Sequence, residues 1–285
     1  MSETRLTCAE IYPWLGDHWS FFMQRLANNK LAHALLIEGP AGIGKTKLAS
    51  AMVARLLCRE DQPQACGQCR SCKLLEGLAH PDCFDLFPDE DSEVIKVDQV
   101  RALIAKLNLT TSISERKVAY IHPAEAMNSA AANALLKCLE EPAGDTVLIL
   151  VSDDPGRLPV TIRSRCQAIS IKQPDPLVVL NWLEQSHGNP PEQIEVALQA
   201  AGGSPLRAAN FLDSPGVEAF AQVRMGLATL LGRPGSVSKV SSELNLIKPV
   251  DLWRWLSICT GEVIKSTMTV CTSRNNIDCG GICSP

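Results

Sequence analysis

The feature that most constrains this chain is the stretch GPAGIGKT, from Gly39 to Thr46. An apolar run, HALLIEG, comes directly before it, and the segment KTKLASAMVARLLC after it has apolar residues at helical spacing. A complete glycine-rich motif between a buried strand and an amphipathic helix indicates a phosphate-binding loop, and a chance glycine-rich turn is the weaker interpretation. Lys45 is expected to reach the β- and γ-phosphates of a nucleotide, and the Thr46 hydroxyl to contact Mg²⁺. The residues expected to bind the nucleotide are Gly39, Gly42, Gly44, Lys45 and Thr46.

The acids that nucleotide hydrolysis requires are missing from their expected place. Such a domain supplies carboxylates at the end of a strand, here KVAYI, to hold Mg²⁺ and to polarise water. The chain has His122 and Pro123 there. Neutral imidazole is a poor ligand for a hard cation, and proline offers no ligand. Glu125 could replace the missing acid, but we favour a solvated loop carboxylate. The sequence therefore predicts that nucleotide binds and that hydrolysis is absent or weak.

Strands and helices alternate up to about residue 170, which predicts an α/β domain. The run DTVLILVS has no polar alternation, as is typical of a parallel strand covered on both faces. Three short helical segments separated by proline and glycine then predict a small helical domain over residues 171–213. A longer helical region is expected over residues 214–285. Its tail, from about Thr267, has no sustained period, and we expect it to be irregular.

Cysteines form two groups among the twelve in the chain. The first group has the spacing C-x7-C-x2-C-x2-C and comprises Cys58, Cys66, Cys69 and Cys72. Four thiolates in a short loop suit tetrahedral Zn²⁺ in a structural site, while a redox-active CxxC and unrelated buried thiols are the alternatives. The second group is irregularly spaced and comprises Cys259, Cys271, Cys279 and Cys283. We favour no function for this second group, with a second zinc site as the alternative.

Charge and hydropathy exclude few classes of protein. The net charge is −4 and the sequence pI is about 5.8, so no global basic field indicates nucleic acid, although a local basic face or a basic partner could make that contact. No apolar run is long enough to span a bilayer. The N-terminal segment lacks the basic and apolar regions of a signal peptide. We therefore expect a cytoplasmic protein.

Several segments together resemble the clamp-loader group of AAA+ proteins, and within it the delta-prime family of bacterial DNA polymerase III. They are HALLIEGPAGIGKT, the first cysteine group, AAANALLKCLEEP, LPVTIRSRC and GGSPLRAA. The similarity extends from Tyr12 to about residue 255. It implies a RecA-like AAA+ domain over residues 1–170 with a zinc module at 58–72, a helical lid domain over 171–213, and an all-helical collar domain over 214–285. A full collar of this group is longer, so we expect a truncated collar, with genuine divergence as the alternative.

The resemblance also implies roles for single residues. Arg165, in Ser164-Arg165-Cys166, corresponds to the arginine finger that acts on the ATP of a neighbouring subunit. By itself, either Arg163 or Arg165 could equally be a solvated surface arginine. Arg207 corresponds to a lid arginine that senses the nucleotide phosphates. Ser152 and Asp153 fall where the ATPases of this group place a sensor near the γ-phosphate, and the first cysteine group corresponds to the zinc ligands.

The function implied by the resemblance is that of a stator, since the departure at His122-Pro123 is typical of the delta-prime family. A stator of this kind assembles with the motor (gamma/tau) and delta subunits into a heteropentamer within the replisome. The heteropentamer, part of a DNA-directed DNA polymerase complex, loads the sliding clamp onto primed DNA. An active motor-type ATPase is the first alternative. A zinc-dependent nucleic-acid-binding module is the second, disfavoured by net acidity and by few aromatic and basic residues around the cysteines.

Overall fold

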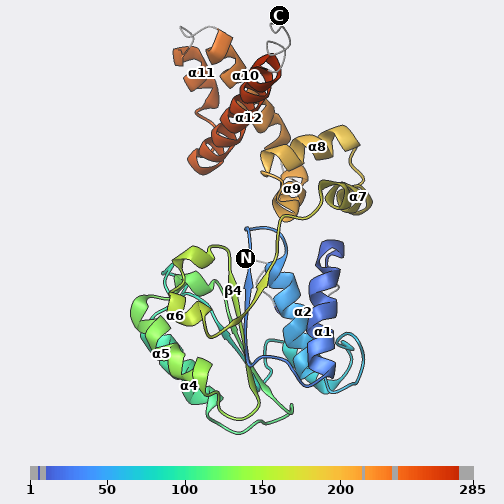
Figure 1. Cartoon of the computed structure of the whole chain (residues 1–285), viewed down its shortest axis with the longest axis vertical. Coiled ribbons are helices and arrows are strands. Elements are labelled where there is room, and N and C mark those ends of the chain that lie inside the picture. The colour runs from blue at the N-terminus through green and yellow to red at the C-terminus, as the bar shows by residue number, and fades with distance from the viewer. Residues whose placement is uncertain (1–5, 7–10, 214–215, 233–236, 276–285) are drawn as a thin grey trace, which may run out of the picture. The chain divides into compact units, whose positions relative to one another are not determined.

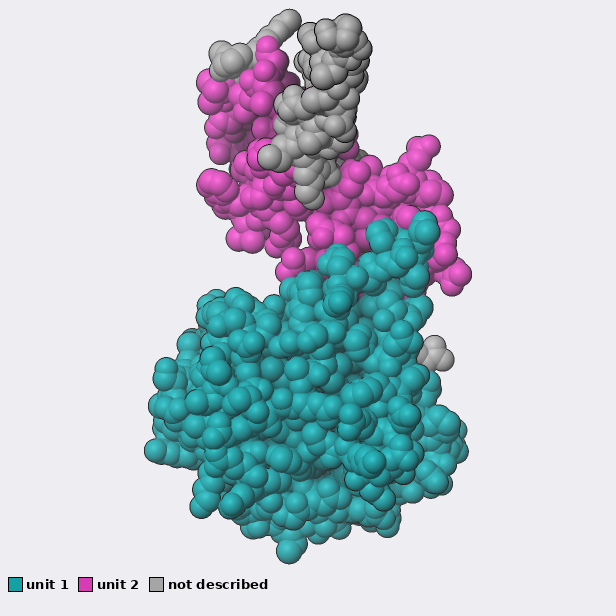
Figure 2. All heavy atoms as spheres, viewed as in Figure 1, with its two compact units in different colours: residues 1–179 teal, residues 180–285 magenta. Residues whose placement is uncertain are grey.

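The computed structural model describes residue 6 and residues 11–213, 216–232 and 237–275 of the 285-residue chain. The chain divides into two compact units, residues 1–179 and residues 180–285 (Figure 2). Among the described residues, no helix combines the length and the apolar character needed to cross a membrane.

The first unit is built on a five-stranded sheet in the order β2-β3-β4-β1-β5. All of its strand pairs are parallel. The strands are β1 (Ala34–Glu38), β2 (Cys83–Leu86), β3 (Lys117–Ile121), β4 (Thr146–Ser152) and β5 (Gln167–Ser170). Every residue of β3 and β4 is buried, as the continuous apolar runs predict for central parallel strands. The expected α/β fold with a parallel sheet is confirmed.

Helices cover both faces of this sheet (Figure 1). The helices of the first unit are α1 (Gly16–Ala27), α2 (Lys45–Leu57), α3 (Arg70–Glu76), α4 (Val97–Leu107), α5 (Ser129–Glu140) and α6 (Val160–Arg163), with short 3-10 helices η1 (Pro13–Leu15), η2 (Ala124–Ala126) and η3 (Pro155–Arg157). Alternate side chains of β1 point to opposite faces of the sheet and pack in two separate hydrophobic cores. Leu35 and Ile37 pack with α1 and α2, whereas Ala34 and Leu36 pack with α4 and α5. Both faces are therefore apolar, and functional polar groups are left to the ends of the strands.

The second unit is all-helical. Its helices are α8 (Pro191–Ala200), α9 (Pro205–Leu212), α10 (Gly216–Gly232), α11 (Val237–Leu244) and α12 (Pro249–Asn275), and α7 (Pro176–His187) ends in it. Three aromatic rings, on α9, α10 and α12, meet edge-on: Phe211, Phe220 and Trp255 have centroids 5.8–6.2 Å apart. Edge-to-face packing of this kind fixes helices relative to one another. The domain boundaries expected at residues 170 and 213 stay predictions.

The expected irregular tail is wrong up to Asn275. Helix α12 continues without interruption from Pro249 to Asn275, and residues 276–285 lie outside the described part of the chain. Neither glycine nor proline occurs between Gly261 and Gly280, so nothing in the sequence ends the helix there. Threonine, valine and cysteine cost only tenths of a kcal/mol each in a helix. The absence of an apolar stripe was therefore insufficient reason to expect irregular backbone.

Asp82, directly before β2, anchors a loop of the first unit. The residue is 1% exposed, and its carboxylate accepts hydrogen bonds from the backbone N–H groups of Ser112 (2.6 Å), Ile113 (2.7 Å) and Ser114 (2.8 Å). Burial opposes ionisation, but these three N–H groups lower the pKa of Asp82 below its ordinary value. The charged form of Asp82 therefore stabilises the folded chain.

We expect Asp82→Asn to lower the free energy of unfolding by about 2–4 kcal/mol, because an amide cannot accept three hydrogen bonds as a carboxylate does. The folded-state pKa lies below the unfolded one, so the stabilisation is present above about pH 4 and is lost as the pH falls through the folded-state pKa. Urea unfolding of both proteins at neutral and acidic pH measures this. The exposed Asp91→Asn is the matched control. If wild type and Asp82→Asn differed in free energy of unfolding by the same amount at acidic and at neutral pH, the stabilisation would not come from the charged form of Asp82.

Candidate functional site

The loop between β1 and α2 requires glycine at two positions. Gly39 has a φ of 150°, and a Cβ atom there would lie 2.2 Å from the carbonyl oxygen of Ile171. Gly44 has a φ of 91°, and a Cβ atom there would lie 2.5 Å from the ring of Tyr12. Backbone this close to its neighbours leaves no room for a side chain. The loop thus has the tight, glycine-dependent turn expected of an anion-binding backbone.

Two aromatic residues support the loop from outside. The rings of Tyr12 and Trp14 stack with centroids 5.0 Å apart, and the indole Nε1–H of Trp14 donates a hydrogen bond to the carbonyl oxygen of Ile43 at 2.8 Å. The Tyr12 ring covers the α-carbon of Gly44. Sequence reasoning did not assign these aromatics a role. Aromatic residues just before a helix are usually core residues, and only the fold brings them to the loop.

Lys45 is the first residue of α2 and is 3% exposed. Its ammonium group donates to the carbonyl oxygens of Gly39 (2.7 Å) and Pro40 (2.5 Å), and its Nζ lies 2.6 Å from Oδ1 of Asp153. An ammonium group has three N–H bonds, so each has an acceptor within the chain. Thr46 follows on the first turn of α2 and is half-buried.

Glu125, on η2, is not the solvated loop carboxylate that we favoured from the sequence, so that expectation is wrong. Its Oε1 accepts a hydrogen bond from the backbone N–H of Asp153 at 3.0 Å. Its Oε2 is buried and has no hydrogen-bond partner among the described residues. The error arose because β3 and β4 are adjacent in the sheet, so the loops that follow them meet in space. That adjacency cannot be read from local sequence.

His122, at the end of β3, is half-buried at the same edge of the sheet. Burial lowers the pKa of His122 below its ordinary value, although the charges of Asp153 and Glu125 act to raise it. The imidazole is therefore neutral at neutral pH. Ser152, the last residue of β4, is fully buried, and its hydroxyl lacks a hydrogen-bond partner within the described part of the molecule.

Arg165 follows α6 and is paired within the chain. Its Nε donates to Oε1 of Glu140 at 2.7 Å, its Nη2 forms an ion pair with the same carboxylate, and its Nη1 donates to the carbonyl oxygen of Thr161 at 2.9 Å. The side chain is 34% exposed. The guanidinium group is therefore fixed in direction while it remains in contact with solvent.

Arg165 and the glycine-rich loop lie at opposite edges of the sheet. The loop follows the carboxyl end of β1, whereas Arg165 precedes the amino end of β5. These two strands pair in parallel, with Leu35 beside Gln167 and Glu38 beside Ser170. The length of β5 therefore separates Arg165 from the loop of its own chain.

The other predicted arginines are on the surface of their units. Arg163, the last residue of α6, is exposed. Arg207 is exposed on α9, in the second unit, whereas the loop belongs to the first. Its expected role as a phosphate sensor stays a prediction.

The first cysteine group is gathered in space. Its four sulfur atoms all lie within 4.8 Å of one another. Backbone N–H groups point at the sulfurs, with Cys66 N–H on Cys58 Sγ at 3.4 Å and Cys69 N–H on Cys66 Sγ at 3.3 Å. Burial opposes ionisation of Cys69, but backbone N–H groups and neighbouring thiols lower its pKa to about 6. These are conditions under which thiolates form and bind metal.

The spacing of these sulfurs fits a metal ion. In a tetrahedral zinc site with Zn–S bonds of about 2.3 Å, the sulfurs lie roughly 3.8 Å apart. The Sγ atoms of Cys66 and Cys72 lie 3.9 Å apart. This pair has the separation of two zinc ligands, so the group could bind an ion such as zinc. In the second cysteine group, Cys259 is buried on α12, and Cys279 and Cys283 lie outside the described residues, so the interpretation of that group stays a prediction.

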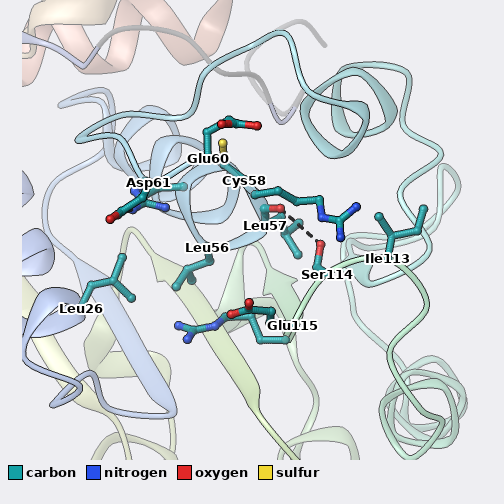
Figure 3. Close-up of a pocket in the computed structure, with 12 residues that line it drawn as sticks. Leu26, Leu56, Leu57, Cys58, Glu60, Asp61, Ile113, Ser114 and Glu115 are labelled. Atoms are coloured by element: carbon teal, nitrogen blue, oxygen red, sulfur yellow. Dashed lines mark hydrogen bonds and ion pairs between the residues drawn. The ribbon is translucent and has the colours of Figure 1, made fainter.

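A polar cavity of about 430 Å³ lies beside the cysteine module (Figure 3). It is lined by Leu26, by residues 55–61 at the end of α2, and by residues 113–116 before β3. Its walls carry three arginines and three acids, namely Arg55, Arg59, Arg116, Glu60, Asp61 and Glu115. Because the two signs balance, the lining does not favour a ligand of either charge.

Comparison with known proteins identifies related sequences. A family model described as "DNA polymerase III, delta subunit" matches residues 15–175. The DNA polymerase III subunit delta' of Pseudomonas aeruginosa is 43% identical over 264 residues, covering 92% of this chain and 79% of that protein. The DNA polymerase III subunit delta' of Escherichia coli is 35% identical over 195 residues, covering 68% of this chain and 58% of that protein.

Solved structures with a similar arrangement are more distant. A DNA polymerase III gamma subunit-related protein of Thermotoga maritima aligns over 85% of this chain and 78% of its own, with 18% identity and a TM-score of 0.42. A variant of the Thermotoga maritima protein RuvB aligns over 89% of this chain and 72% of its own, with 14% identity and a TM-score of 0.49.

We expect Gly44→Ala to destabilise the chain by about 2–5 kcal/mol, because a left-handed conformation costs a non-glycine residue roughly 1–2 kcal/mol and a steric clash adds roughly 1–3 kcal/mol. Gly144→Ala is the matched control, since Gly144 also has a positive φ, of 61°, but no atom lies within 4 Å of its added Cβ. Chemical denaturation of wild type and of the two variants measures how much each substitution lowers the free energy of unfolding. Equal destabilisation would show that Tyr12 does not press against the loop.

Proposed function

Because the chain belongs to the delta-prime family of DNA polymerase III subunits, we propose that it is the stator subunit of a bacterial clamp loader. It would assemble with motor (gamma/tau) and delta subunits into a heteropentamer that loads the sliding clamp onto primed DNA. Its contributions would be Arg165, directed at the ATP of a neighbouring subunit, and a glycine-rich loop that holds a nucleotide without cleaving it.

The position of Arg165 carries this proposal. Arg165 lies at the amino end of the strands, whereas the glycine-rich loop of the same chain lies at the carboxyl end. The guanidinium group is therefore unsuited to contact a nucleotide bound to that loop. It is partly exposed and directed by Glu140 and the carbonyl oxygen of Thr161. An arginine supplied to a neighbour stabilises the charge that develops on a transferred phosphoryl group. A preorganised, solvent-accessible arginine is suited to that task.

The groups around the loop support weak or absent hydrolysis by the chain itself. His122 is neutral because of burial and cannot replace the strand-end carboxylate that holds Mg²⁺. Glu125 accepts a hydrogen bond from the backbone of Asp153, so one of its oxygens is already committed. This disfavours an active motor-type ATPase.

The cysteine module supports a structural Zn²⁺ site with Cys58, Cys66, Cys69 and Cys72 as its ligands. Four thiolates complete a tetrahedral shell and leave no position for a reacting water. Cys72 is fully buried, and the side chain of its neighbour Ser71 donates to the carbonyl oxygen of Leu57, at the end of α2. The ion would therefore fasten the module to the sheet domain.

We expect Cys72→Ser to abolish stoichiometric zinc binding and to lower the midpoint of thermal unfolding by several degrees, because metal-binding energy contributes directly to folding. Metal analysis of the purified chain and thermal unfolding with and without a chelator measure both effects. Cys138→Ser is the matched control, since Cys138 is a buried thiol on α5 outside the cysteine module. Equal zinc content in Cys72→Ser and wild type would contradict the site.

We expect Arg165→Ala, assembled with motor and delta subunits, to reduce clamp- and DNA-stimulated ATP turnover at the neighbouring site by roughly 10³-fold or more. The exposed Arg163→Ala, two residues earlier at the end of α6, should leave turnover within about twofold. Size-exclusion chromatography verifies that both variants assemble. Normal turnover by an assembled Arg165→Ala complex would exclude the arginine finger.

Rapid ATP turnover by the isolated chain, lost in Lys45→Ala, would favour the motor-type ATPase instead.

A further inference from the structure

We propose that Asp153 sets the nucleotide specificity of the glycine-rich loop, so that it binds a nucleoside diphosphate such as ADP in preference to ATP. The inference rests on the nucleotide-holding role in the proposed function. It goes beyond that role because it states which nucleotide is held and which residue decides it.

The first step is the position of the Asp153 carboxylate. In a phosphate-binding loop the lysine contacts the β- and γ-phosphates. In this chain Nζ of Lys45 lies 2.6 Å from Oδ1 of Asp153, and its other acceptors are the carbonyl oxygens of Gly39 and Pro40. A carboxylate oxygen of Asp153 therefore already accepts from the Lys45 ammonium group, where a phosphate oxygen would otherwise bind.

The second step is that Asp153 is fixed in this position. It directly follows β4, and its backbone N–H donates to Glu125 at 3.0 Å. Ser152 pairs in register with Glu38, the last residue of β1, so Asp153 lies alongside Gly39 at the start of the loop. Two strands and a hydrogen bond thus fix the backbone of Asp153, from which its carboxylate reaches Lys45. Lys45, at 3% exposed, has little freedom to leave it.

The third step is the charge around the lysine. Lys45 contributes one positive charge, Asp153 and Glu125 each contribute a negative one, and His122 is neutral. These four groups therefore have a net charge of −1. A loop that binds a triphosphate needs the opposite sign near the terminal phosphate.

The two nucleotides respond differently to this arrangement. A diphosphate ends before the γ position and has one negative charge fewer, so it can bind the loop N–H groups while the Lys45–Asp153 ion pair persists. A triphosphate must either break that pair or place its γ-phosphate beside a carboxylate. Asp153 is 42% exposed, so solvent moderates the repulsion without removing it. We expect a preference for ADP of about tenfold to a hundredfold.

The experiment measures the affinity of the full chain for ADP, for ATP and for the non-hydrolysable analogue AMP-PNP by titration calorimetry. Each titration is carried out once with Mg²⁺ and once with a chelator. Wild type should bind ADP at least tenfold more tightly than either triphosphate. Asp153→Asn, which keeps the shape and removes the charge, should raise affinity for both triphosphates about tenfold and change ADP affinity less than threefold. Asp154→Asn is the matched control, an adjacent exposed acid that caps η3, and should behave as wild type.

Several outcomes would overturn the proposal. These are equal affinities for ADP and ATP in wild type, an equal change for both in Asp153→Asn, or no nucleotide binding by either protein. Mg²⁺-dependent tightening of ATP that disappears in Asp153→Asn would also overturn it, since Asp153 would then be a metal ligand. Asp153→Thr provides a second uncharged variant should the first fail to fold. The Arg165 experiment reads turnover at a neighbouring site in the assembly, so either proposal can fail while the other stands.

Discussion

The parallel pairing of β1 with its two neighbours determines where the glycine-rich loop, Asp153 and Arg165 lie in the first unit. The register of β1 with β4 sets Glu38 beside Ser152, which places the loop that begins at Gly39 against Asp153. The register of β1 with β5 sets Leu35 beside Gln167, which places Arg165 at the far edge of the same sheet. Because both faces of the sheet are covered by apolar packing, the polar groups that its strands position lie at the strand ends. The two groups to which the proposed function gives roles, the glycine-rich loop and Arg165, thus lie at opposite edges of one sheet.

Much of this arrangement could be predicted from the sequence, because strong local patterns specify it. The glycine motif between an apolar run and an amphipathic segment predicted the turn from β1 into α2, and the apolar run DTVLILVS predicted the buried β4. The cysteine spacing predicted a cluster whose sulfurs do lie together. Each of these features depends on residues close in sequence, whose geometry is nearly fixed by spacing alone.

The contacts that join distant segments could not be predicted in the same way. The bond between Glu125 and Asp153 joins loops that follow different strands, and the cover of Tyr12 over Gly44 joins the N-terminal segment to α2. Both depend on strand order and on helix packing, which local pattern does not specify. The helical continuation to Asn275 was missed for a different reason, since no apolar stripe marks it and only the absence of helix breakers indicates it.

Two cations of the first unit, Lys45 and Arg165, are each paired with a carboxylate of the same chain, yet the two pairs differ in burial. Arg165 is 34% exposed and its partner Glu140 is 49% exposed, so solvent screens the pair and a phosphate group can replace the carboxylate at small cost. Lys45 is 3% exposed and has loop carbonyls as further acceptors, so separating it from Asp153 would leave a poorly solvated charge. Burial therefore separates a solvent-screened cation, suited to the proposed action on a partner's nucleotide, from one retained by its own loop.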